Sequence, residues 1–165
     1  MAATAASDLL RAEHRRIEAE LDRLLLASKR RGTDMVLELR QAFSALRCLS
    51  HPHFRKEENL FYVYVRMRWP ELLSQLDEQH EHARELERHL LELLESIDCA
   101  PDKRQQTELI RFAAELYDVI QHHIVDEEDS LLRLSDSWLS QEQQASLAAS
   151  MRDLEPSQMR CPQHR

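Results

Sequence analysis

The chain has 165 residues with one glycine and five prolines, and 42% of its residues are hydrophobic. This length fits one domain with its own core, and so little glycine leaves few hairpin turns, which argues against a strand-rich fold. The formal net charge of −8 argues against nucleic acid as a partner, because nucleic acid binding needs a basic surface. No apolar run approaches the roughly 20 residues that cross a bilayer, so we expect no membrane contact.

The N-terminal stretch MAATAASDLL has no basic region followed by a hydrophobic one, so we expect no secretory signal. The three cysteines, Cys48, Cys99 and Cys161, are odd in number and widely spaced. That spacing favours reduced thiols over a disulfide framework. Both features predict a cytoplasmic protein.

Apolar residues recur three and four positions apart in the first half of the chain, which predicts two long helices. The first should run from about residue 7 to 29, capped by Ser7 and followed by a turn at Gly32. The second should run from about residue 34 to 68. Its predicted buried face consists of Leu39, Ala42, Leu46, Leu49, His53, Glu57, Leu60 and Tyr64, and that of the first helix of Leu10, His14, Ile17, Leu21 and Leu24.

Pro52 lies inside the second predicted helix. Proline removes one backbone hydrogen bond and its ring clashes with the carbonyl four residues earlier. We therefore expect a kink or a break near His51.

The second half of the chain predicts two more long helices and a short one. Pro70 should open the third helix, because a missing amide hydrogen costs little at the first helical position. The fourth should run from about residue 102 to 134, and Ser140 with Gln143 forms a capping-box pattern for a short helix to about Leu154. These patterns predict an all-α, antiparallel up-down-up-down four-helix bundle with a short C-terminal fifth helix, as one domain over residues 1–154, followed by a flexible tail over residues 155–165.

Each predicted buried face of the four long helices carries a histidine, and two faces carry a glutamate four residues later. Residues four apart lie on the same side of a helix. A single such histidine is more often a hydrogen-bonded core residue, and a single such glutamate more often reaches solvent. Together they indicate a metal site, because buried charges are tolerated when they are paired or metal-bound. The candidate ligands are His14, His53, Glu57, His80, His123 and Glu127.

Four imidazoles and two carboxylates, with no thiolate, suit iron or manganese better than zinc. Two histidines per ion and two bridging carboxylates would give each ion about four protein ligands. An octahedral ion would keep open positions for a small ligand such as water, dioxygen, peroxide or nitric oxide. The two halves of the chain would contribute equally, each with two imidazoles and one bridge.

Several neighbouring residues leave alternatives open. Glu58 and Glu128 each follow a candidate bridge, and each could be an extra ligand or a solvated or hydrogen-bonding neighbour of the site, since adjacent helix positions diverge by about 100°. His122 is the main rival ligand because it precedes His123. Tyr64 and Tyr117 could donate a hydrogen bond to a bound oxygen species or simply pack in the core. Residues expected outside the site are His51, Arg55, Lys56, Asn59, His82 and His89, with Cys161 and His164 in the tail.

Four stretches, LLRAEHRRIEAELDRLL, HFRKEENLF, DEQHEHARELERHLLELL and HHIVDEEDSLL, together resemble the hemerythrin-like family, the histidine-histidine-glutamate cation-binding domain, over roughly residues 8 to 134. The resemblance implies a non-haem centre of two iron ions, oxo- or hydroxo-bridged, ahead of manganese or zinc. It assigns the four histidines as ligands and Glu57 and Glu127 as bridges. Unlike the oxygen-carrying relatives, the chain has no histidine four residues from His80, and Glu127 follows His123 by four residues rather than five. This difference argues against reversible oxygen storage.

Three functions are then open. The centre could bind or sense a small oxygen or nitrogen species in oxygen or iron sensing or in an oxidative or nitrosative stress response. It could instead be an enzyme that decomposes peroxide, or a protein that donates iron for iron–sulfur repair. A structural metal is the third reading, with function carried by an unidentified protein partner. No phosphate-binding loop and no nucleophile with a recognisable base is present, so a large organic substrate is not expected.

Overall fold

The computed structural model of the chain describes residues 5–154, which contain helices and no strand. The all-α prediction is confirmed. Two of the helical stretches continue through a π-helix into a further α-helix. The elements are α1 (Ala6–Ala27), α2 (Gly32–Lys56), η1 (Glu57–Phe61), α3 (Tyr62–Val65), α4 (Pro70–Glu95), α5 (Lys103–Asp126), η2 (Glu127–Leu132), α6 (Arg133–Trp138) and α7 (Gln141–Asp153).

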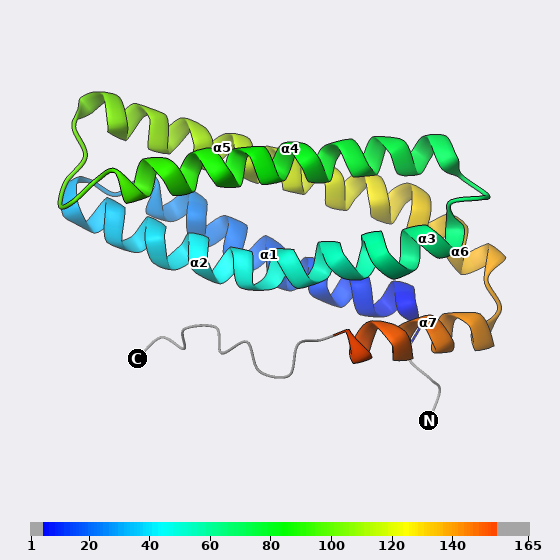
Figure 1. Cartoon of the computed structure of the whole chain (residues 1–165). Helices are drawn as coiled ribbons and strands as arrows, with labels where there is room; N and C mark the ends of the chain where they lie inside the picture. Colours follow the sequence, from blue (N-terminus) through cyan, green and yellow to red (C-terminus); the bar gives the residue numbers. More distant parts are fainter. Residues whose placement is uncertain (1–4, 155–165) are drawn as a thin grey trace.

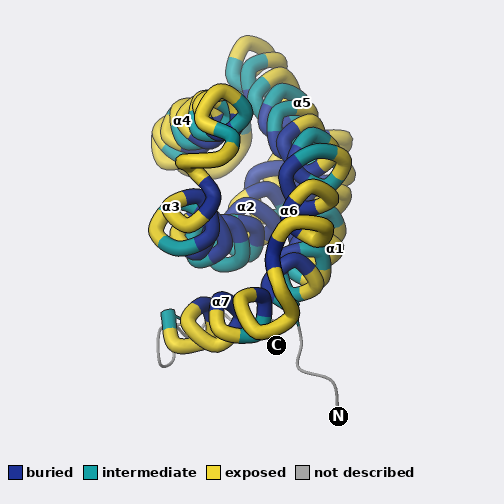
Figure 2. The backbone as a smooth tube through the Cα atoms, turned by 90° about the vertical axis from the view of Figure 1, so that its right-hand side faces the viewer, coloured by how far each residue is buried: buried dark blue, intermediate teal, exposed yellow. Residues whose placement is uncertain are grey.

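The long helices lie alongside one another, and α7 lies against one side of them (Figure 1). α1 packs against α2, α4 packs against α5, and α1 also contacts α5. The α1–α2 and α4–α5 turns lie at one end of the molecule, and the α3–α4 turn lies at the other. Buried residues face the interior of this arrangement and exposed ones face outward (Figure 2).

The interior contains two apolar clusters with a polar layer between them. Ile17 belongs to the larger cluster, which also takes in residues of α2, α4 and α5. Leu10 belongs to the smaller cluster, with residues of η1, α3, η2 and α7. His14 lies between Leu10 and Ile17 in the sequence and is fully buried. The candidate ligands thus occupy the level at which one apolar core gives way to the other.

Two of the predicted helix starts are confirmed. Pro70 is the first residue of α4. At α7, the hydroxyl of Ser140 accepts a hydrogen bond from the backbone N–H of Gln143, and the Gln143 side chain accepts one from the backbone N–H of Ser140. This exchange satisfies two of the amides that a helix start leaves unpaired.

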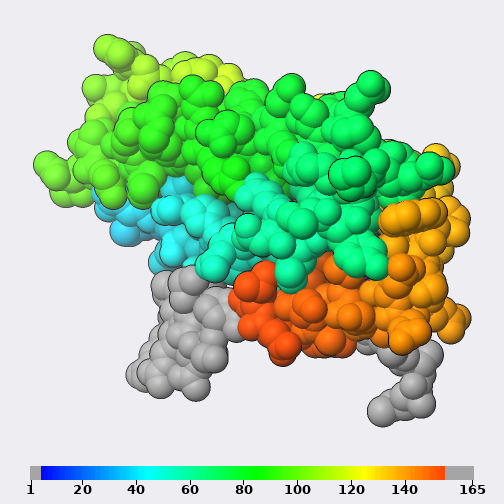
Figure 3. Space-filling view, turned by 45° about the vertical axis from the view of Figure 1, so that its right-hand side comes forward, coloured from blue at the N-terminus to red at the C-terminus, as the bar shows by residue number. Residues whose placement is uncertain are grey.

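The predicted cap of α1 is wrong. Ala5 is the residue before α1 and cannot accept a hydrogen bond through its side chain. Instead, Oε1 of Gln144 on α7 accepts hydrogen bonds from the backbone amides of Ala6 at 3.0 Å and Ser7 at 3.3 Å. The Ser7 hydroxyl donates to the carboxylate of Asp136. The start of α1 is therefore capped by a helix from the other end of the chain, and the space-filling view shows α7 packed along the body of the molecule (Figure 3).

Of the kink or break predicted near His51, the break does not occur. α2 continues through this residue without interruption to Lys56. The regular helical bonding changes further on, at η1, which begins at Glu57.

The π-helix η1 also corrects the predicted buried face. A π-helix bonds each carbonyl to the amide five residues on and so accommodates one extra residue in the turn. The face that continues from Glu57 therefore passes through Phe61 and Val65, which are fully buried. Leu60 is only partly buried and Tyr64 is 43% exposed, so their predicted places on the buried face are wrong.

Within residues 5–154, no helix has both the length and the apolar composition that a bilayer-spanning helix needs. The predicted flexible tail, with Cys161 and His164, lies outside the described residues. The assignment of residues 1–154 to one domain stays a prediction.

Candidate metal centre

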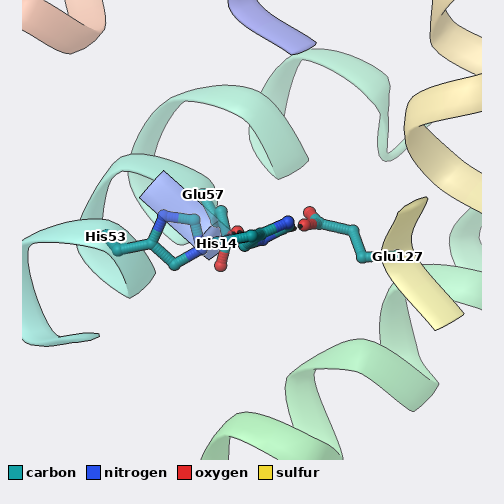
Figure 4. Close-up of side chains that lie close together, drawn as sticks. All are labelled: His14, His53, Glu57 and Glu127. Atoms are coloured by element: carbon teal, nitrogen blue, oxygen red, sulfur yellow. Dashed lines mark ion pairs between the residues drawn. The ribbon is translucent and has the colours of Figure 1, made fainter. Parts of the chain in front are cut away.

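All six predicted ligands lie together in the interior, and none is more than 1% exposed. Figure 4 shows His53 and Glu57 next to each other and the carboxylate of Glu127 directed at the ring of His14. Six elements contribute one ligand each. They are α1 with His14, α2 with His53, η1 with Glu57, α4 with His80, α5 with His123 and η2 with Glu127.

The six side chains form two overlapping groups, and in each group one potential ligand atom per residue lies within 4.8 Å of the others. Glu57 is common to both groups. Its Oε1 lies 2.7 Å from Nε2 of His53, and its Oε2 lies 3.0 Å from Nε2 of His80. The first group is His14, His53, Glu57 and Glu127, and the second is Glu57, His80 and His123.

The two carboxylates are not equivalent in this arrangement. Each oxygen of Glu57 faces a different histidine pair: Oε1 lies near His14 and His53, and Oε2 near His80 and His123. Oε2 of Glu127 lies 3.1 Å from Nε2 of His14, and Glu127 joins the first group alone. Glu57 is thus shared by both groups and Glu127 belongs to one, and the bridging roles of both carboxylates stay predictions.

Buried polar atoms that make no hydrogen bond of good geometry are concentrated at this centre, although several of them form close His–Glu pairs. Within the described residues they include both carboxylate oxygens of Glu57 and of Glu127, and Nε2 of His14 and of His53. A buried polar atom left without a partner costs about 1–3 kcal/mol. Cations placed among these atoms would satisfy all of them together, so the residues fit a metal centre.

Glu58 and Glu128 hydrogen-bond to ligand histidines rather than joining the centre. Nδ1–H of His80 donates to Glu58 at 2.8 Å, and Nδ1–H of His14 donates to Glu128 at 2.8 Å. Such a bond fixes the ring and leaves the Nε2 lone pair free for a metal. Each glutamate is also bound by an arginine, Glu58 by Arg84 and Glu128 by Arg15.

The other two ligand histidines have partners that the sequence did not indicate. Nδ1–H of His53 donates to Oε2 of Glu13 at 2.9 Å, and Nδ1–H of His123 donates to Oε1 of Gln79 at 3.2 Å. Glu13 and Gln79 directly precede His14 and His80 in the sequence. This shared position before a ligand histidine is visible in the sequence. The sequence does not show that each residue contacts a ligand histidine on another helix.

Lys56, expected in water, is in fact 3% exposed and binds the carboxylate of Glu13. In the second half of the site, Asp126 stands at the equivalent position before the glutamate and accepts a hydrogen bond from the Gln79 side chain at 2.7 Å.

The remaining alternatives fall outside the centre. Nδ1–H of His122 donates to the backbone carbonyl of Asp118 at 2.8 Å, and its side chain is exposed. His51 pairs with Glu87 at 2.6 Å, away from the six ligands. His82 is exposed, as expected, whereas His89 is half-buried and stacks on Phe112 with ring centroids 5.5 Å apart.

Tyr62 is the tyrosine at the centre, and neither of the two candidates, Tyr64 and Tyr117, lies there. Tyr64 is partly exposed and accepts a hydrogen bond from Gln143, and Tyr117 packs against the larger apolar cluster. Tyr62 is fully buried, its ring stacks on His80 with centroids 5.7 Å apart, and its hydroxyl has no hydrogen-bond partner within the described residues. Burial, and then the charges of nearby carboxylates, raise the pKa of Tyr62 well above its usual value, so it stays a donor.

Carboxylates set the protonation of the centre. Burial alone would lower the pKa of His14, but the nearby carboxylates, Glu127 first, outweigh it and raise that pKa to about 11. Burial also lowers the pKa of His80, but Glu57 and Glu58 outweigh burial and raise that pKa to about 9. The charge of His53 outweighs burial and holds the pKa of Glu57 well below its usual value.

We expect metal binding at pH 7 to release at least about two protons per chain, because a bound imidazole must give up the proton that would block its lone pair. His14 and His80, with pKa values of about 11 and about 9, carry two of those protons. Burial lowers the pKa of His53, but the charge of Glu57 outweighs burial and raises it, so His53 adds to the release. Burial lowers the pKa of His123, which has none to release. Calorimetric titration with metal in buffers of different ionisation enthalpy measures the number, and a heat that is the same in every buffer would contradict the expectation.

The fold and the site together define a helical protein with a buried histidine–carboxylate site for cations. The model of the family described as hemerythrin HHE cation binding domain matches residues 5–135, and the chain belongs to this family. The matched region contains all six candidate ligands and ends before α7. No curated protein and no solved structure matches the chain in the other two comparisons.

Proposed function

We propose that the chain binds two iron ions at this centre and uses them to bind or handle a small oxygen or nitrogen species: dioxygen, peroxide or nitric oxide. One observation supports this most directly: a single buried carboxylate, Glu57, is shared by two separate histidine groups. The proposed role is in oxygen or iron sensing, or in an oxidative or nitrosative stress response.

The donor set favours iron over the alternatives. All candidate ligand atoms are nitrogen or oxygen, which suits iron or manganese better than zinc. When bound, such ions supply Lewis acid and redox chemistry. The chain's own residues orient the histidine rings through their Nδ1 hydrogen bonds and keep bulk water away from the centre.

The surroundings of the centre suit a small ligand. Phe54 stacks on His80 with ring centroids 4.1 Å apart, and Tyr62 also stacks on that ring. This aromatic packing on a ligand ring favours a small ligand over a large substrate. The Tyr62 hydroxyl is a buried donor without a partner among residues 5–154, and it could donate a hydrogen bond to a ligand with a lone pair.

A peroxide-decomposing enzyme is the second candidate. The observation that favours it is the smaller ligand group, in which three protein side chains, Glu57, His80 and His123, would leave an ion with open positions. Open positions are typical of catalytic rather than structural metal sites.

We also propose a bundle topology and a cellular location. The four long helical stretches form an up-down-up-down bundle, supported by turns that lie at alternating ends (Figure 1). A cytoplasmic location is proposed because Cys48 and Cys99 form no disulfide within the described residues. A sensing role would further need a protein partner.

Metal analysis and optical spectroscopy test the proposal. Protein purified in air should contain about two irons per chain by the ligand inventory, and its near-ultraviolet bands should change on addition of azide or peroxide. His53→Ala and Glu127→Ala should each lose iron, whereas the surface control His82→Ala should not. Stoichiometric zinc, or an intact fold that takes up no metal, would refute the proposal. Rapid oxygen release from peroxide would favour the enzyme.

A further inference from the structure

The two halves of the centre share one plan of supporting contacts. The residue before the ligand histidine of α1 or α4 accepts a hydrogen bond from the ligand histidine of the next long helix. These residues are Glu13, which binds His53, and Gln79, which binds His123. In each half, the residue before the glutamate, Lys56 or Asp126, then binds that acceptor.

The chemistry of this plan differs between the halves. In the first half the acceptor for His53 is a carboxylate, Glu13, and Lys56 compensates its charge. In the second half the acceptor is the neutral amide of Gln79. The Gln79 NH₂ group donates to Asp126 at 2.7 Å, which turns the amide oxygen toward His123.

A carboxylate acceptor makes its histidine the stronger ligand. Hydrogen bonds to ionised acceptors are shorter and roughly twice as strong as those between neutral groups. The bond from His53 to Glu13 is 2.9 Å long, and the bond from His123 to Gln79 is 3.2 Å long. The greater pull on the Nδ1 proton of His53 puts more electron density on its Nε2, the atom that would bind the metal.

The other supporting contacts do not offset this difference. His14 and His80 both donate to a glutamate at 2.8 Å, and each of those glutamates is bound by an arginine. These two contacts are therefore matched between the halves. The number of ligands adds to the difference, because the group with His53 has four side chains and the group with His123 has three.

We infer that the two metal positions are unequal: the position of His14, His53, Glu57 and Glu127 fills first and holds its ion, and the position of Glu57, His80 and His123 fills second and exchanges its ion. Gln79 is the positioning residue that sets this difference. The inference rests on the proposed function, since it assumes that the centre binds two ions.

Exchanging the supporting pairs between the halves tests the inference. The variant Gln79→Glu with Asp126→Lys gives the second half the carboxylate–lysine pair of the first. The variant Glu13→Gln with Lys56→Asp gives the first half the amide–aspartate pair of the second. The control Gln75→Glu adds a charge one turn before Gln79, at an exposed position of the same helix.

The measurement is an anaerobic titration with Fe²⁺ against a competing chelator, with circular dichroism as a check of the fold. The native chain should bind iron in two steps of different affinity. Gln79→Glu with Asp126→Lys should tighten the weaker step by about 10- to 100-fold, and Glu13→Gln with Lys56→Asp should weaken the tighter step by a similar factor. Gln75→Glu should change neither step.

A single substitution covers the case in which a paired variant does not fold. Glu13→Gln alone nearly keeps the side-chain shape and should weaken the tighter step only, whereas general damage to the structure would weaken both. Two equal steps in the native chain, or steps that none of these changes moves, would overturn the inference and leave the proposed function standing. A native chain that binds no iron would overturn the proposed function itself.

Discussion

Replacing Glu57 with glutamine is expected to remove both metal ions, whereas replacing Glu127 with glutamine should mainly affect one. The two oxygens of Glu57 face His53 on one side and His80 on the other, at 2.7 and 3.0 Å. Glutamine keeps the shape but has one oxygen and an NH₂ group that cannot bind a cation. Glu127 belongs to the first ligand group alone, so the second group remains complete without it.

Metal content after removal of loosely held ions measures both effects. Glu87→Gln is the matched control, because Glu87 is also a buried glutamate, 4% exposed, but binds Ser50 and His51 away from the ligands. The control should keep the native metal content. A Glu57→Gln protein that still held two ions would contradict the assignment of Glu57 as the bridge.

Loading with metal is expected to raise the melting temperature by about 5–10 °C. A ligand that binds only the folded chain, present at 100 times its dissociation constant, stabilises it by about 2.7 kcal/mol. For a chain of this size each kcal/mol shifts the melting temperature by roughly 2–4 °C. Scanning calorimetry of the metal-free and the anaerobically Fe²⁺-loaded protein measures the shift, and Glu57→Gln should show little of it.

The difference in melting temperature between the metal-loaded and the metal-free protein should widen above neutral pH. A histidine whose pKa is raised by folding stabilises the folded chain fully below its unfolded pKa of 6.5, and that contribution is lost as the pH rises to the folded value. His80 loses its contribution by about pH 9 and His14 by about pH 11. The metal-free protein should therefore melt at progressively lower temperature between pH 7 and pH 10. A metal-free melting temperature that rises over this range would contradict the assigned partners.

The helices could be predicted from the sequence because their signals are local. Apolar spacing located the long helices, and Pro70 and the Ser140–Gln143 pair marked two helix starts. The π-helices left no such signal, since one extra residue in a turn hardly changes the spacing over a whole helix. Because η1 accommodates one extra residue, Tyr64 lies at the surface and Tyr62 lies at the centre.

The six candidate ligands could be predicted because each is costly to bury on an apolar face. Their supporting residues could not. Glu13 and Gln79 are each one position away from a ligand, so their side chains point away from the buried face of their own helix. Both nevertheless accept a hydrogen bond from a histidine on the neighbouring helix. Such contacts depend on how two helices are rotated against each other, which the spacing within one helix does not fix.

The cap that Gln144 places on α1 bears on how the protein should be produced. A fragment trimmed at residue 135, where the family match ends, would lack α7. The first amides of α1 would lose their acceptor, and the apolar cluster that contains Leu10, one turn from His14, would lose Leu147 and Met151. Water would then reach toward the ligands from that end. For work on the metal, the smallest useful piece of this protein is longer than its recognisable domain.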